Sequence, residues 1–163
     1  MKVFDAHCHV YPDAIASRAA DSIGQFYQLK MHMSGNLHDL LEKGAEAGIS
    51  RFLINSAAVT PNRVKAINDF LMQAVASDAR LQGFGTMHPD CGDVEAELDR
   101  LKAGGLLGVK LHPDFQHFCL DDEKAIAMFQ AMADRNLPAL IHTGDQRYPY
   151  SEPRRMARVL DRV

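Results

Sequence analysis

Apolar residues along the chain follow two alternating patterns. Short apolar runs predict buried strands at residues 3–10, 50–56, 81–88, 107–113 and 137–143. Longer segments with apolar residues at helical spacing predict amphipathic helices at about 14–28, 37–47, 61–78, 93–103, 122–135 and from 151 onward. Because strand and helix alternate five times, we expect an α/β fold with a parallel sheet and helical crossovers.

Several helix boundaries have recognisable signals. Thr60 precedes Pro61, which predicts an N-cap followed by proline in the first helical position. Asp93 is a second candidate N-cap, and Gly48 and Gly104 follow the helices at 37–47 and 93–103. These signals support the predicted order of elements.

Histidines follow four of the five predicted strands. His9, His88, His112 and His142 each stand at or near the carboxyl end of a strand. In parallel α/β folds, ligands bind at this edge of the sheet. We therefore expect the histidines to gather on one rim and to form a functional site there.

The first strand contains two histidines separated by one residue. Alternation in a strand places Asp5, His7 and His9 on one face, with Cys8 on the other. Two imidazoles on one face form a candidate site for a divalent metal, with Asp5 as an outer partner. The alternative is that they are two unrelated histidines.

Other strand ends offer further candidates. His142 is a possible third metal ligand, or a rim histidine that contacts only substrate. Lys110 points into the barrel and is expected to pair with Asp5 or another carboxylate, or, less favoured, to be carboxylated between two metals. His112 could contact substrate, support a ligand or be structural.

The loop after the fifth strand is rich in polar and aromatic residues. Asp145 and Arg147 are candidates for substrate binding, with Arg147 suited to a carboxylate. A solvated loop remains the favoured alternative for this segment. These two residues complete the set of candidate side chains.

Composition narrows the class of protein. The 163 residues are 47% hydrophobic and 24% charged, with a net charge of -3, as expected for one globular domain over 1–163. Neither nucleic acid nor a membrane is an expected partner. Three cysteines without paired spacing and no leader-like N-terminus predict a cytoplasmic protein without disulfides.

Three segments together resemble a known family: Asp5-Ala6-His7-Cys8-His9, Gly108-Val109-Lys110-Leu111-His112-Pro113 and Ile141-His142-Thr143-Gly144-Asp145. They are similar to the amidohydrolase superfamily, in particular to its amidohydrolase-related group of metal-dependent hydrolases and nonoxidative decarboxylases. The resemblance implies a TIM (β/α)8-type barrel. It also implies that His7 and His9 bind zinc or a similar ion, with His142 as a third ligand or close to it.

In this family a histidine after strand six and a catalytic aspartate after strand eight complete the site. A full barrel takes about 250 residues, so we expect this chain to hold the first five βα units, with strands 6–8 absent. Open barrel edges then favour a homo-oligomer.

The expected function is metal-dependent hydrolysis of a small-molecule amide, ester or lactone. Two alternatives stay open. One is metal-dependent decarboxylation of an aromatic or unsaturated acid. The other is a fragment that binds no metal and is inactive.

Overall fold

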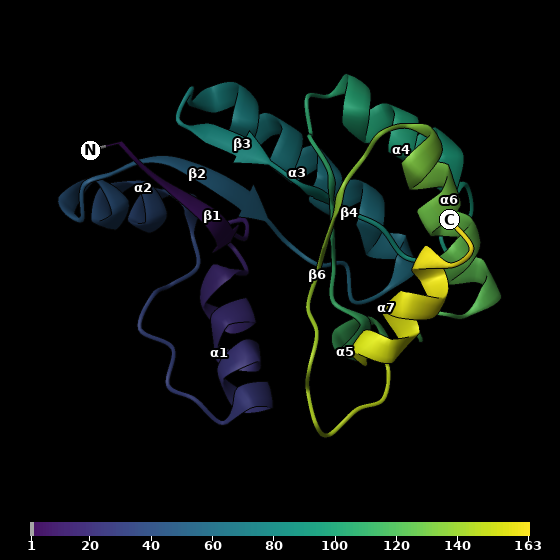
Figure 1. Cartoon of the computed structure of the whole chain (residues 1–163). Coiled ribbons are helices and arrows are strands. Elements are labelled where there is room, and N and C mark those ends of the chain that lie inside the picture. Colours follow the sequence, from purple (N-terminus) through teal and green to yellow (C-terminus); the bar gives the residue numbers. More distant parts are fainter. Residues whose placement is uncertain (1) are drawn as a thin grey trace.

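The computed structural model describes residues 2–163 and contains two three-stranded parallel sheets flanked by helices (Figure 1). The strands are β1 (Val3–His9), β2 (Ile49–Asn55), β3 (Leu81–Gly83), β4 (Gly85–Thr86), β5 (Val109–Leu111) and β6 (Ala139–Ile141). The helices are α1 (Ala16–Tyr27), α2 (Leu37–Glu46), α3 (Val64–Ser77), α4 (Val94–Ala103), α5 (Pro113–Gln116), α6 (Glu123–Asp134) and α7 (Pro153–Leu160). A 3-10 turn at Pro61–Arg63 leads into α3.

The predicted α/β order is confirmed. The two sheets have the orders β1-β2-β3 and β4-β5-β6, and β3 and β4 are two parts of the strand predicted at 81–88. Phe84 joins them: its N–H donates to the carbonyl of Ile54 (2.9 Å), and the next N–H, that of Gly85, donates to Gly108 (2.9 Å). Within residues 2–163 no strand connects β6 back to β1, so the barrel is not closed.

The sheet has a helix side and an inner face. A Cβ on Gly44 of α2 would meet the Phe52 ring, and one on Gly83 would meet Val75 of α3, so residues 52 and 83 face helices. Ile54 pairs in register with Gly83 and faces the same way. Successive strand residues point to opposite faces, so Asn55 and Phe84 lie on the inner face.

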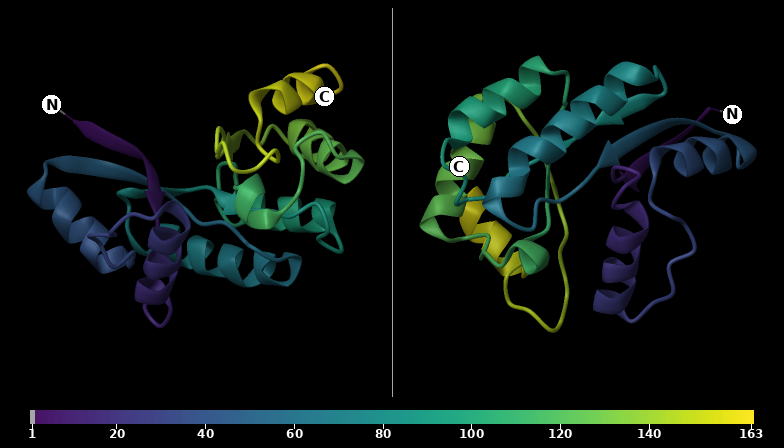
Figure 2. Two further views of the ribbon diagram at one scale, coloured as in Figure 1. Left: turned by 90° about the horizontal axis from the view of Figure 1, so that it is seen from below. Right: turned by 180° about the vertical axis from the view of Figure 1, so that it is seen from behind.

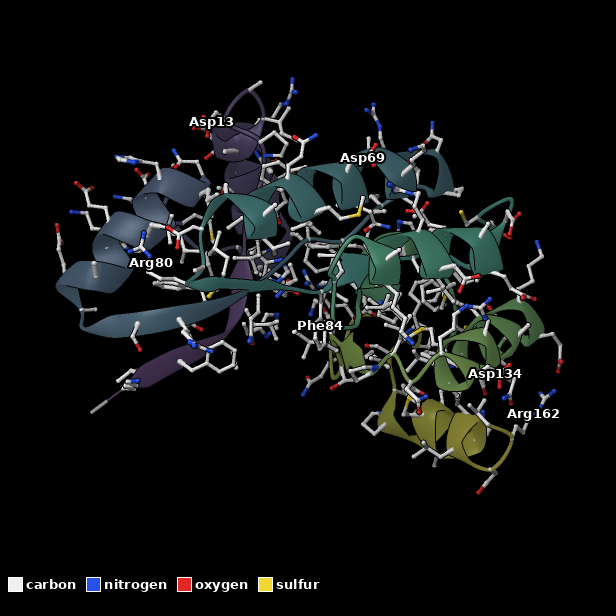
Figure 3. The ribbon with its side chains drawn as sticks, turned by 90° about the horizontal axis from the view of Figure 1, so that it is seen from above. Asp13, Asp69, Arg80, Phe84, Asp134 and Arg162 are labelled. Carbon is white, nitrogen blue, oxygen red and sulfur yellow. The ribbon has the colours of Figure 1, made fainter. Side chains whose placement is uncertain are left out.

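The inner face continues onto β5. A Cβ on Gly108 would lie 2.7 Å from the Phe84 ring, so residue 108 lies on the same face as that ring. Lys110, two residues further on, shares this face. The sequence prediction that Lys110 points inward therefore agrees with the packing around Phe84, which lies near the middle of the molecule while Asp69, Asp134 and Arg162 lie at its outside (Figure 3).

A bulge in β1 corrects one prediction. Asp5 pairs with Phe52 and Cys8 pairs with Ile54, so three steps along β1 match two along β2. Strict alternation therefore does not hold between Asp5 and Cys8, although Asp5, His7 and His9 still line one cavity. The Asp5 carboxylate accepts a hydrogen bond from the backbone N–H of His7 (3.2 Å), and it has no bond to either imidazole among the described residues.

The helix caps agree only in part with the sequence. Asp93 accepts a hydrogen bond from the N–H of Ala96, as predicted for the start of α4. Thr60 precedes the 3-10 turn, but its hydroxyl bonds to the side chain of Asn62 (2.6 Å) and caps no N–H. Asn36 caps α2 through the N–H of Asp39.

Most helices pack along the outer side of the sheet, but α1 does not. It follows β1 and stands beyond the carboxyl end of that strand, apart from α4, α6 and α7 (Figure 2). This position brings the end of α1 to the rim where the histidines gather. No helix within residues 2–163 is both long and apolar enough to cross a bilayer.

Candidate functional site

The histidines gather at the carboxyl ends of the strands. His9 is the last residue of β1, His112 follows β5 directly, and His142 follows β6 directly. His88 lies two residues beyond β4, where its Nε2 contacts the carbonyl of Gln116 (3.2 Å). The predicted common rim is therefore present, although His88 is occupied by a structural bond.

His7 and His9 form a convergent pair. Their Nε2 atoms lie 3.1 Å apart, and the two rings are tilted by 36°. A zinc–nitrogen bond is about 2.0–2.1 Å, so two imidazoles on one ion place their nitrogens about 2.9–3.4 Å apart. The observed separation is compatible with a shared ion, and it also suits an N–H···N hydrogen bond between the two rings.

Both imidazoles are kept in the neutral form that binds a metal. Burial lowers the pKa of His9 to about 3, and the nearby charge of Lys110 adds to this. The pKa of His7 is also lowered, first by burial and then by Lys110. At neutral pH each ring therefore has a free lone pair.

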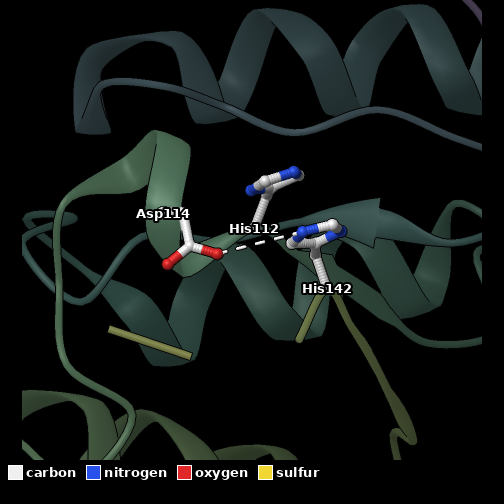
Figure 4. Close-up of side chains that lie close together, drawn as sticks. All are labelled: His112, Asp114 and His142. Atoms are coloured by element: carbon white, nitrogen blue, oxygen red, sulfur yellow. Dashed lines mark ion pairs between the residues drawn. The ribbon is translucent and has the colours of Figure 1, made fainter. Parts of the chain in front are cut away.

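His112, Asp114 and His142 form a second group (Figure 4). Their ligand atoms all lie within 4.8 Å of one another, with His142 Nε2 3.9 Å from Asp114 Oδ2. The rings of His112 and His142 stack 4.0 Å apart and are nearly parallel, at 8°. The backbone N–H of His142 donates to Leu111 (3.1 Å), which holds the two rings side by side.

Tyr27, at the end of α1, closes this second group. Its hydroxyl lies 3.0 Å from His112 Nε2 and 3.2 Å from His142 Nε2. Burial lowers the pKa of His112 to about 3 and also lowers the pKa of His142, against the opposing effect of Asp114. The pKa of Asp114, which is fully buried, is raised by burial.

The two groups differ in what they can hold. An imidazole binds a metal along a lone pair that lies in the ring plane, and parallel stacked rings cannot direct both lone pairs to one point. His112 and His142 are therefore arranged for hydrogen bonding, whereas His7 and His9 converge. Among the described residues, His142 groups with His112 and Asp114 and not in a compact set with His7 and His9.

Lys110 does not have its predicted partner. Its side chain is 1% exposed, yet within the part of the chain that the structure describes it forms no ion pair with Asp5 or any other carboxylate. The Asp5 carboxylate instead accepts a hydrogen bond from the backbone N–H of His7 (3.2 Å). Burial lowers the pKa of Lys110 to about 8.

The loop after β6 is fastened by its own side chains. Arg147 donates to both carboxylate oxygens of Asp145 (3.0 and 2.7 Å) and to the carbonyl of Phe26 (2.6 Å). Its guanidinium also lies 4.3 Å from the centre of the Phe26 ring. The hydrogen bonds to Arg147 lower the pKa of Asp145 to about 2. Arg147 thus ties this loop to α1, and its guanidinium is already engaged.

A cavity of about 580 Å³ opens at the rim. Its polar end includes His9, His112 and Asp114, and its walls include the aromatic rings of Phe26 and Phe115. The Phe26 and Phe115 rings are 4.4 Å apart in an edge-to-face arrangement. A largely apolar cavity with a few convergent polar groups suits a small organic ligand.

Two members of the site were not selected from the sequence. Asp114 lies two residues after His112, and this spacing could have indicated that it belongs to the same site. No sequence signal pointed to Tyr27. It is the last residue of α1, far from His112 and His142 in sequence, and its hydroxyl reaches them only because of where α1 lies. Both residues contact groups on the predicted rim.

Comparisons with known proteins identify the family and the fold. A family model described as amidohydrolase matches residues 4–163. The fold is similar to that of IDCase from Metarhizium anisopliae, with a TM-score of 0.68 and 17% identity over 99% of this chain and 60% of that one. It is also similar to a manganese-bound 5-carboxyvanillate decarboxylase from Novosphingobium aromaticivorans, with a TM-score of 0.65 and 16% identity over 88% and 51% of the two chains.

The chain therefore spans 51–60% of the length of these two structures. Both likenesses concern the fold. No curated protein matches the sequence.

Proposed function

Because the chain belongs to the amidohydrolase family, we propose that it carries the metal-binding histidines of a metal-dependent hydrolase. The substrate would be a small-molecule amide, ester or lactone. The observation that carries this proposal is the 3.1 Å separation of the His7 and His9 Nε2 atoms, both in neutral rings. Zinc is the metal we expect, since two imidazole ligands suit it, although imidazole also binds other divalent ions.

His7 and His9 would hold the ion, and His142 is proposed as a third ligand or as a contact to the substrate. A divalent metal, when bound, lowers the pKa of a water ligand and polarises a carbonyl. His142 Nε2 now contacts the Tyr27 hydroxyl (3.2 Å), so either role requires that this contact be broken.

The rest of the site would position substrate and protons. The aromatic walls of the cavity at Phe26 and Phe115 exclude water from one side of a bound ligand. Asp114 lies 3.9 Å from His142 Nε2 and has a raised pKa, so it is placed to exchange a proton with that ring. Asp145 and Arg147 would act indirectly, by fixing the loop against α1.

Decarboxylation is the second candidate. One structure with a similar fold is a decarboxylase with bound manganese, and the same pair of histidines could hold the ion for either reaction. The two reactions differ in their products, because hydrolysis consumes water and decarboxylation releases carbon dioxide.

The first test is metal binding. We expect the purified protein to bind one Zn²⁺ or Mn²⁺ with an affinity that His7→Ala and His9→Ala each lower by about a hundredfold or more, because each variant removes one of the two converging ligands. Isothermal titration calorimetry after EDTA treatment measures this. His32→Ala, which changes an exposed histidine away from the rim, is the matched control. Equal affinity in all four proteins would contradict the proposal.

A further inference from the structure

The last residues of β1 and β2 contain buried polar atoms that lack partners. Asn55 is 0% exposed, and neither its Oδ1 nor its Nδ2 atom has a hydrogen-bond partner among residues 2–163. The Nδ1 atom of His9 is also buried and without a partner in this part of the chain, as is Oδ1 of Asp114, which lies beside His142. Buried polar atoms are normally paired, so those of Asn55 and His9 require an explanation.

His9 and Asn55 are neighbours on the inner face. They are register partners on adjacent parallel strands, and the backbone N–H of Val10 donates to the carbonyl of Asn55 (3.1 Å). The pairs Cys8–Ile54 and His9–Asn55 follow one another without a register shift, so both side chains of the second pair point away from the helix side. Paired strands lie about 4.7–4.9 Å apart, which places an amide and an imidazole on partner residues within reach of each other.

Metal binding would determine which nitrogen of His9 carries the proton. The Nε2 atoms of His7 and His9 face each other at 3.1 Å, so these are the atoms that an ion would share. A neutral imidazole carries one proton, and a ring that gives its Nε2 lone pair to a metal must carry this proton on Nδ1. The Nδ1–H of His9 then needs an acceptor in the interior, because its Nδ1 is buried.

The amide of Asn55 is the acceptor that the neighbouring strand provides. Its oxygen has free lone pairs, and no hydrogen bond to the described chain holds the amide in its present orientation, so the oxygen can turn toward His9. The Asp5 carboxylate, which is close to His9 in sequence, is bonded to the backbone N–H of His7 instead. An uncharged acceptor also suits a fully buried position, because it adds no unpaired charge.

We propose that Asn55 is a positioning residue for the metal site, whose Oδ1 accepts a hydrogen bond from His9 Nδ1–H when His9 binds the ion through Nε2. This bond fixes the tautomer and the ring orientation of His9 and raises the basicity of its Nε2. It is the role that the sequence predicted for Asp5. The inference rests on the proposed function and adds to the site a residue from a second strand.

Zinc affinity tests this role with two variants of Asn55. Asn55→Leu has a similar shape but no acceptor, and we expect it to lower the zinc affinity of the EDTA-treated protein by about tenfold or more. Asn55→Asp keeps an acceptor oxygen and should bind zinc at least as tightly as the parent. Asn62→Leu, at an exposed asparagine of the 3-10 turn, is the matched control, and calorimetry measures all four proteins.

Two outcomes of this titration would overturn the proposal. In the first, Asn55→Leu binds zinc as tightly as the parent does, so that no acceptor is needed at this position. In the second, Asn55→Asp loses as much affinity as Asn55→Leu, so that an acceptor oxygen does not account for the effect.

A spectroscopic measurement separates positioning from a purely structural role. In zinc-loaded protein with isotope-labelled histidine, nuclear magnetic resonance shows which ring nitrogen is protonated and which binds the metal. We expect the Nδ1–H proton of His9 to exchange slowly with water and to show a nuclear Overhauser contact to the Asn55 side chain. Asn55→Leu should speed this exchange and leave the ring nitrogens of His7 unchanged. If the parent shows no contact between His9 Nδ1–H and Asn55, the proposal is wrong even if both variants fail to fold.

The two proposals fail in different ways. If His7→Ala and His9→Ala bind zinc as the parent does, the metal-dependent function falls, and the role of Asn55 falls with it. If these two variants lose the metal while Asn55→Leu keeps both the zinc affinity and the slow Nδ1–H exchange of the parent, only the role of Asn55 falls.

Discussion

Two asparagines, Asn68 and Asn55, are equally buried on opposite sides of the sheet and have opposite surroundings. On the helix side, Asn68 of α3 donates to the carbonyl of Thr86 (3.0 Å) and to Glu97 (2.7 Å), and it accepts from the N–H of Thr86 (2.7 Å). On the inner face, Asn55 has no partner for either side-chain atom in the described chain. Both side chains are 0% exposed.

This contrast separates polar groups that are satisfied within the fold from those that are not. Around Asn68 the network extends through Glu97 to Arg100, and every member is paired within the chain. On the inner face, both side-chain polar atoms of Asn55 and the Nδ1 atom of His9 are buried and have no partner among the described residues. Polar groups on the helix side are therefore satisfied by the fold itself, whereas some of those on the inner face are not.

The largest expected effect comes from exchanging each asparagine for alanine. Asn68→Ala leaves the N–H and carbonyl of Thr86 and part of Glu97 without partners in the interior, so we expect it to lower the free energy of unfolding by about 3 kcal/mol. Asn55→Ala leaves no buried group without its hydrogen-bond partner and should change the free energy of unfolding by less than about 1 kcal/mol. Urea denaturation of the metal-free protein measures both. Similar losses for the two variants would show that Asn55 has a structural partner and would remove the contrast.

The second largest effect is expected from lowering the pH, which should reduce the free energy of unfolding through the buried histidines of the rim. The folded-state pKa of His112 is about 3, whereas an unfolded histidine titrates near its usual value of 6.5. Between these values the unfolded state binds more protons, so stability falls as the pH is lowered from 6.5 toward 3. At pH 5 this cost is about 2 kcal/mol for His112. His9 has the same shift and adds to the loss.

Urea denaturation of the EDTA-treated protein at pH 7, 6 and 5 would measure this loss. His112→Gln should flatten the dependence, because it removes one of the two rings whose pKa is lowered to about 3. A parent protein as stable at pH 5 as at pH 7 would mean that these rings are not held neutral.

The smallest effect concerns the hydroxyl that closes the second histidine group. Tyr27→Phe removes the contacts to His112 and His142, and we expect it to lower stability by about 1 kcal/mol. If His142 joins His7 and His9 on the metal, the same variant should raise metal affinity by about fivefold, because a competing hydrogen bond is gone. Tyr148→Phe, at the wall of the same cavity, is the control. Unchanged metal affinity in Tyr27→Phe would argue against His142 as a ligand.

Much of the architecture followed from local patterns. Apolar runs marked all five strands, because strands of a parallel sheet are rich in β-branched and aliphatic residues. The rim position of the histidines also followed from order alone, since parallel strands present their carboxyl ends at one edge. His7 and His9 needed only their separation by a single residue to be placed together, as the 3.1 Å between their ring nitrogens shows.

The tertiary structure decided the partners. The bulge in β1 left Asp5 bonded to the backbone N–H of His7 and not to an imidazole, and strict alternation along a strand cannot anticipate an inserted residue. The position of α1 brought Tyr27 onto His112 and His142. Lys110 was predicted to point inward, but its lack of a counter-ion depends on where every carboxylate in the chain lies. Residue order determines which face a side chain occupies, whereas the groups that meet it there depend on packing between segments far apart in sequence.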